Sequence, residues 1–119
     1  MNSAAITAHA PLDLAEAQAS VLAWFDDLGL ELAYAEGDLL IAWLDDAIDP
    51  YDEGFVGAPS LVVEAKIHSL REGVQVRCSV HHGEGSLDAT LAAEADRGLR
   101  RCLNADKRWV MDNRSLRRR

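Results

Sequence analysis

The sequence lacks positive charge in its first half, because residues 1–63 contain no Lys or Arg while holding 12 Asp or Glu residues. The whole chain carries 20 acidic and 12 basic side chains, a formal net charge of -8. A protein of this charge repels phosphate backbones and anionic lipid surfaces. We therefore expect neither a nucleic-acid partner nor a membrane partner.

Cysteines and long apolar runs are also scarce. The 119 residues include 2 cysteines, too few for a disulfide scaffold. The longest uninterrupted apolar run is Leu39 to Leu44, far short of the ~20 residues that a membrane-spanning helix needs. The first residues have neither the basic region nor the apolar run of a signal peptide. We expect a cytoplasmic protein with reduced thiols.

The sequence contains no motif that predicts catalysis or a metal site. There is no G-x-S-x-G, and Cys78 and Cys102 fall at apolar periodic positions, where a thiol is usually an inert small hydrophobe. His68, His81 and His82 lie near Cys78, but alternation along strands directs His82 and Cys78 to the opposite face from His68 and His81. We expect no catalytic residues, no metal and no cofactor.

What is present is an ordinary globular pattern with 49% hydrophobic residues. Two helical periodicities flank two strand-like hairpins, and a short alternating segment follows the second helix. This predicts one α+β domain, an antiparallel sheet of two hairpins plus a short final strand, packed against an N-terminal and a C-terminal helix. The expected parts are a flexible lead-in at 1–11, a domain at 12–112 and a basic tail at 113–119.

The helices carry recognisable signals. Asp13 and Glu16 have the spacing of a capping box before the first helix, and Gly29 supplies its stop. Gly98 interrupts the second helix at a cost of up to ~1 kcal/mol, so we expect a close packing contact there.

The turns determine how the strands of the two hairpins pair. In the first, a turn at residues 36–37 places Leu30, Leu32, Tyr34, Leu39, Ile41 and Trp43 on the core face. In the second, one register places Lys66 opposite Arg77, and the other places Glu64 opposite His81 and Lys66 opposite Ser79. We favour the second because it separates the like charges.

The back of the first hairpin is the predicted interaction surface. Leu40 and Leu44 fall there, and an apolar face that no helix covers marks an interface. The acidic loop that follows offers negative potential to a basic partner. The candidate partner-binding residues are Leu40, Trp43, Leu44, Asp45, Asp46, Asp49, Asp52 and Glu53.

The stretch LGLELAYAEGDLLIAWL from Leu28 to Leu44, and the ending CLNADKRWVMD from Cys102 to Asp112, resemble the YbjN-like family, which is related in fold to the type III secretion chaperones. This resemblance implies a non-catalytic protein that dimerises and binds extended segments of other proteins. The basic final segment departs from the acidic character of such chaperones, and the resemblance transfers no individual functional residue.

Our leading hypothesis is a non-catalytic, acidic protein-binding module, chaperone- or adaptor-like, that forms a homodimer and binds another protein. A second hypothesis is an immunity or inhibitor protein whose acidic face covers a basic active site, such as that of a nuclease. A third is an enzyme with an unrecognised site. Binding steered by acidic residues weakens with ionic strength, whereas capture of an apolar segment does not, which separates the first two.

Overall fold

Two ten-residue strands, β4 (Leu61–Leu70) and β5 (Gly73–His82), form the longest hairpin of the protein. The computed structural model describes residues 5–44, 61–82 and 86–112. Every second residue is buried from Leu61 to Ile67 and from Val74 to Val80, as the alternation in the sequence predicts. The buried set is Leu61, Val63, Ala65, Ile67, Val74, Val76, Cys78 and Val80.

The hairpin forms the centre of a six-stranded antiparallel sheet with the order β2-β3-β4-β5-β1-β6. The other strands are β1 (Ile6–Ala10), β2 (Glu31–Glu36), β3 (Leu39–Leu44) and β6 (Val110–Met111). Along the chain the elements follow the order β1-α1-β2-β3-β4-β5-α2-β6. The predicted fold class, an antiparallel α+β sheet with an N-terminal and a C-terminal helix, is confirmed.

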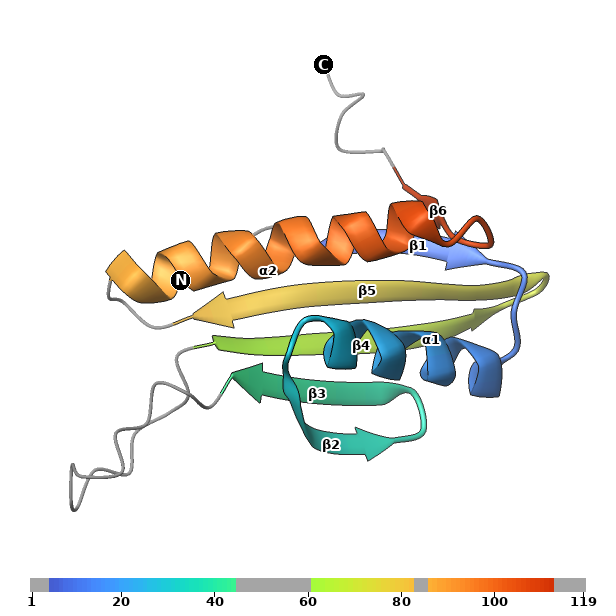
Figure 1. Ribbon diagram of the computed structural model, residues 1–119. Helices are drawn as coiled ribbons and strands as arrows, with labels where there is room; N and C mark the ends of the chain where they lie inside the picture. Colours follow the sequence, from blue (N-terminus) through green and yellow to red (C-terminus); the bar gives the residue numbers. More distant parts are fainter. Residues whose placement is uncertain (1–4, 45–60, 83–85, 113–119) are drawn as a thin grey trace.

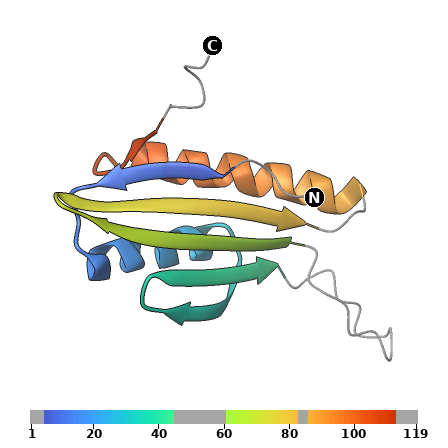
Figure 2. The ribbon, with the colours of Figure 1, turned by 180° about the vertical axis from the view of Figure 1, so that it is seen from behind.

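Both helices, α1 (Leu14–Asp27) and α2 (Ser86–Ala105), pack on the same face of the sheet (Figure 1). The view from behind shows the sheet in front of both helices (Figure 2). Within the described ranges no element covers this second face, which we call the open face. The apolar residues that the helices bury include Val21, Trp24, Phe25, Leu99 and Leu103.

The predicted helix signals are confirmed. The Asp13 carboxylate accepts a hydrogen bond from the Glu16 backbone N–H at 2.8 Å, and the Glu16 side chain accepts one from the Asp13 backbone N–H at 3.1 Å. Gly98 lies directly against Leu28, whose Cδ2 occupies the space that a β-carbon at position 98 would need. The glycine therefore allows α2 to approach the end of α1 closely.

The prediction of a flexible lead-in over residues 1–11 is wrong for Ile6–Ala10, which form β1. This strand pairs with β5, so that Ile6 lies opposite Cys78 and Ala10 opposite Val74. Ile6, Ala8 and Ala10 are buried while Thr7 and His9 point to the open face. Two of the three buried residues are alanines, which give a weak strand signal.

The register favoured for the second hairpin is also wrong. The turn falls at residues 71–72, Leu70 pairs with Gly73, and Lys66 consequently lies directly opposite Arg77. Both registers keep the same residues in the core, because they differ by a shift of two, so the apolar pattern does not distinguish them. Gly73 supports the observed turn with a φ of 152°, a conformation that a residue with a β-carbon rarely adopts.

Among the described residues, no helix has the length and apolar character that a membrane crossing requires.

Candidate functional site

Strand β3 presents the opposite face from the one predicted, whereas Leu30 is buried as predicted. Leu40 pairs with Ala65 and Ala42 with Val63, and all four residues are buried under the helices. Leu40 is 1% exposed, so its predicted place on an exposed interface is wrong. Leu44 lies on the same side, partly buried against the core. The segment is apolar at every position, so its periodicity does not reveal which half is the core.

A bulge in β2 contributes to this inversion. Leu32 pairs with Ala42, but Tyr34 pairs with Ile41, so one extra residue, Ala33, is accommodated between them. A bulge of one residue moves the following side chains to the other face of the sheet. Tyr34 therefore lies on the open face, where it is 44% exposed.

Five apolar side chains lie together on the open face, and we call them the apolar stripe. Ile41 and Trp43 alternate with the buried Leu40 and Ala42, and the pairing of β2, β3 and β4 sets the remaining members beside them. None of the five is fully buried. The stripe consists of Tyr34, Leu39, Ile41, Trp43 and Val62.

Charged residues of opposite sign border the apolar stripe. Glu36, at the end of edge strand β2, accepts a hydrogen bond from the Tyr34 hydroxyl at 2.8 Å, and this bond is the main cause of a raised Tyr34 pKa. On the other side stand Glu64, which pairs with Ile41 and lies 3.5 Å from His81, and then Lys66 and Arg77, which are directly opposite one another. The Asp38 carboxylate lies 3.7 Å from the Lys66 ammonium, whereas Arg77 has no ionic partner in the described part of the chain.

The distal part of the open face is polar. The carboxylate of Asp112, just after β6, bonds the His9 ring Nδ1 at 2.8 Å and accepts a second hydrogen bond from the Gln75 amide at 3.3 Å. Its backbone N–H donates to the Thr7 carbonyl at 2.8 Å. These bonds fasten the end of β6 across β1 and β5. The apolar exception in this region is Val110, which pairs with His9 and is 54% exposed.

A cavity of about 270 Å³ opens on the opposite side, between the helices and the ends of β3 and β4. Its apolar walls include Leu30, Leu44 and Leu61, and its charged lining is Asp27, Glu94 and Arg101. In the residues the structure places, no three His, Cys, Asp or Glu side chains form a group that could hold a metal ion.

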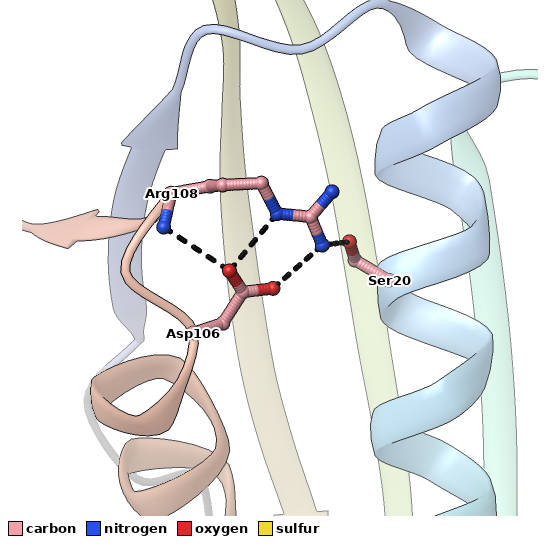
Figure 3. A network of polar contacts seen from close by, with 3 residues as sticks. All are labelled: Ser20, Asp106 and Arg108. Carbon is pink, nitrogen blue, oxygen red and sulfur yellow. Dashed lines mark hydrogen bonds and ion pairs between the residues drawn. The ribbon is translucent and has the colours of Figure 1, made fainter.

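An ion pair between Asp106 and Arg108, which we call the clamp, lies just after α2. The Arg108 guanidinium donates to both carboxylate oxygens of Asp106, at 2.9 and 2.7 Å, and to the Ser20 hydroxyl of α1 at 3.4 Å (Figure 3). The hydrogen bond from Arg108 holds the pKa of Asp106 below its ordinary value. Nearby, the rings of Trp24 and Trp109 meet edge to face at 5.2 Å. The clamp connects the segment after α2 to α1.

The two thiols are poorly suited to nucleophilic chemistry. Burial raises the pKa of Cys78 to about 12. Partial burial, followed by the hydrogen bond to Asp27, raises the pKa of Cys102, whose Sγ lies 3.5 Å from the Asp27 carboxylate. A raised pKa lowers the thiolate fraction, and the thiolate is the reactive form.

Of the three described residues that were predicted to bind a partner, Trp43 lies on the open face, although the predicted pairing placed it on the core side. Leu40 and Leu44 belong to the helix-covered side. Asp45, Asp46, Asp49, Asp52 and Glu53 lie outside the described residues. Tyr34, Leu39 and Ile41 were predicted to face the core, and the structure places all three on the open face. The bulge that turns Tyr34 leaves no clear signal in the sequence.

No family model, no curated protein and no solved structure matches this chain.

Proposed function

We propose that the chain is a non-catalytic protein-binding module, adaptor- or chaperone-like, and that the open face is its binding surface. We place its action in the cytoplasm, where its two free cysteines would remain reduced. The observation that carries the proposal is the apolar stripe on a face that the described helices leave uncovered. The relationship to the YbjN-like family stays a prediction.

The stripe has the anatomy of a protein interface. Aromatic residues are enriched at such interfaces, and Tyr34 and Trp43 supply two large rings here. Charged and polar groups surround the apolar residues, as at the rim of a typical interface. Apolar surface patches that are rimmed by polar residues mark sites of protein interaction.

The geometry favours a partner over a small ligand. The stripe is carried by three neighbouring strands and is not enclosed, whereas a small-molecule site is usually a concave pocket. A second sheet face or an extended segment lies flat against such a surface and can bury it along its whole length.

The test is partner capture from nuclease-treated native lysate with matched variants. Ile41→Glu places a charge in the centre of the stripe, and Leu22→Glu places the same charge on the exposed side of α1. We expect a defined partner to be retained by the wild type and by Leu22→Glu but lost with Ile41→Glu. Equal capture by all three would contradict the proposal.

A salt series in the same experiment addresses the inhibitor hypothesis. Contacts made by apolar side chains persist at high ionic strength. The attraction between exposed charges, in contrast, is screened over a distance of about 10 Å at 0.1 M salt and over a shorter distance at higher salt. A partner that is lost at high salt, and that Ile41→Glu captures as well as the wild type does, would indicate an electrostatic inhibitor in place of the proposed module.

A further inference from the structure

We infer that the partner on the open face is a second copy of this chain, bound face to face about a two-fold axis that runs along β3. This inference rests on the proposed function and names the occupant of the proposed surface. An interface of this symmetry is made by the same patch on both subunits, so the patch must be complementary to itself. The charges that border the apolar stripe meet that condition.

One row of residues across the open face carries the argument. Glu36 pairs with Leu39, Leu39 with Lys66, and Lys66 with Arg77, so the four side chains follow one another from edge strand β2 to β5. The row reads acid, apolar, base, base. Its apolar member lies on β3, with opposite charges on its two sides.

A two-fold axis along β3 places this row over itself in reverse. The apolar residues of β3 then face those of the second copy, in the aligned packing that is common between two sheets. Glu36 of one copy comes to lie over Lys66 of the other, with Arg77 one strand away and long enough to reach it. The two-fold symmetry repeats this contact, so each ion pair between the copies forms twice.

The same arrangement explains an unfavourable feature of the single chain. Like charges directly opposite one another on a sheet are destabilising. Asp38 lies near Lys66, but no carboxylate within the described ranges lies within ion-pair distance of Arg77. A second copy supplies the missing carboxylate through Glu36, and the cost of the like-charge pair is offset in the assembly.

The stripe supplies the desolvated centre of this dimer. Ile41 and Trp43 of the two copies meet near the axis, where hot-spot residues of interfaces concentrate. The polar end of the open face, with His9 and Gln75 held by Asp112, lies farther from the axis. That region forms no part of the proposed contact.

Sedimentation velocity and light scattering of the purified full chain, from micromolar to sub-millimolar concentration, test the inference. We expect a dimer for the wild type and a monomer for Ile41→Glu. The controls are Leu22→Glu, which adds the same single charge on α1, and Arg97→Glu on α2, which changes the net charge by as much as the reversal of a basic residue on the open face. Both controls should dimerise like the wild type.

Charge reversal tests the symmetry. Lys66→Glu and Glu36→Lys should each raise the dimer dissociation constant by about tenfold, because each places like charges face to face twice. The double variant restores opposite charges and should recover most of that loss. Circular dichroism of each variant verifies that the fold is intact.

Several results would overturn the inference. These are a wild-type chain that stays monomeric, a dimer that Ile41→Glu leaves intact, and charge reversals whose effects simply add in the double variant. A monomeric wild type that still captures another protein through Ile41 would overturn the second-copy assignment and leave the proposed function standing. A chain that neither dimerises nor captures another protein would contradict both the inference and the proposed function.

Discussion

Lys66 and Arg77 lie directly opposite one another on neighbouring strands of the open face, although both carry positive charge. The pairing follows from the turn at residues 71–72, which fixes the register of the longest hairpin. It sets a local concentration of positive charge in a protein of formal charge -8. Within the described sheet, no other two like charges lie directly opposite one another, and this pair borders the proposed binding surface.

Gly73 should be among the least replaceable residues of the protein. Its φ is 152°, and a β-carbon there would collide with the backbone of Ala10 and lie 2.9 Å from the Pro11 Cα. The end of β1 thus crosses directly over the hairpin turn. We expect Gly73→Ala to lower the free energy of unfolding by about 2–4 kcal/mol, from backbone strain and displacement of β1. Urea denaturation gives the value.

Gly37 provides the control for that substitution. It also has a positive φ, 62°, but a β-carbon there meets nothing within 4 Å. Gly37→Ala should therefore cost only about 1 kcal/mol, the price of the left-handed conformation alone. Equal effects at positions 37 and 73 would show that the close approach of β1 contributes nothing.

Gly98 and Leu28 should be energetically coupled. In the wild-type background, Gly98→Ala forces the Leu28 side chain aside, and we expect a net loss of about 1 kcal/mol. With Leu28 shortened to alanine the collision disappears, and the higher helix propensity of alanine should then stabilise α2 by about 0.5–1 kcal/mol. A double-mutant cycle by chemical denaturation measures the change of sign. Additive effects would contradict the contact.

The Asp106–Arg108 clamp predicts a pH dependence of stability. The hydrogen bond from Arg108 lowers the pKa of Asp106 in the folded state, so the unfolded chain binds the proton more readily. The stabilisation is fully present above the ordinary carboxyl pKa of about 4 and disappears as the pH falls through the lower folded value.

Asp106→Asn isolates this contribution. The stability difference between wild type and variant should be largest near neutral pH and should shrink below about pH 4. Because the Arg108 side chain of this pair is half exposed to solvent, we expect a difference below about 1 kcal/mol. Thermal denaturation between acidic and neutral pH measures it, and a difference that grows on acidification would refute the assigned ion pair.

Thiol titration with a chromogenic disulfide should distinguish the two cysteines. Cys78 is fully buried with a pKa of about 12, so in the native protein it should remain unmodified at pH 8. Cys102 is partly accessible and should react slowly, because its pKa is also raised. Both should react at once in denaturant. Rapid modification of Cys78 in the folded chain would mean that the sheet opens locally.

Both helices and the central hairpin could be predicted from the sequence because the signals for them are local. The capping box at Asp13 and the alternation of β4 and β5 each require only neighbouring residues. The missed strand β1 depends instead on its partners, because its short run of small residues becomes a strand only by pairing with β5 and β6.

The candidate surface was harder to predict for a related reason. In the apolar run of β3, a shift of one residue exchanges core and surface, and only tertiary packing decides between Leu40 and Ile41. The sequence placed the exposed apolar face on the side of Leu40 and Leu44, which the structure shows to be the core side. The identity of that side came from the pairing of Leu40 with Ala65.

The central claim is that protein covers the apolar stripe, and hydroxyl-radical footprinting read by mass spectrometry tests it most directly. The measurement compares oxidation of Tyr34 and Trp43 between the wild-type chain and Ile41→Glu, with exposed Leu22 as the internal reference. We predict that the two aromatic rings are protected in the wild type and become reactive in the variant, while Leu22 does not change. Equal oxidation of Tyr34 and Trp43 in both proteins, at every concentration and in native lysate, would contradict the account.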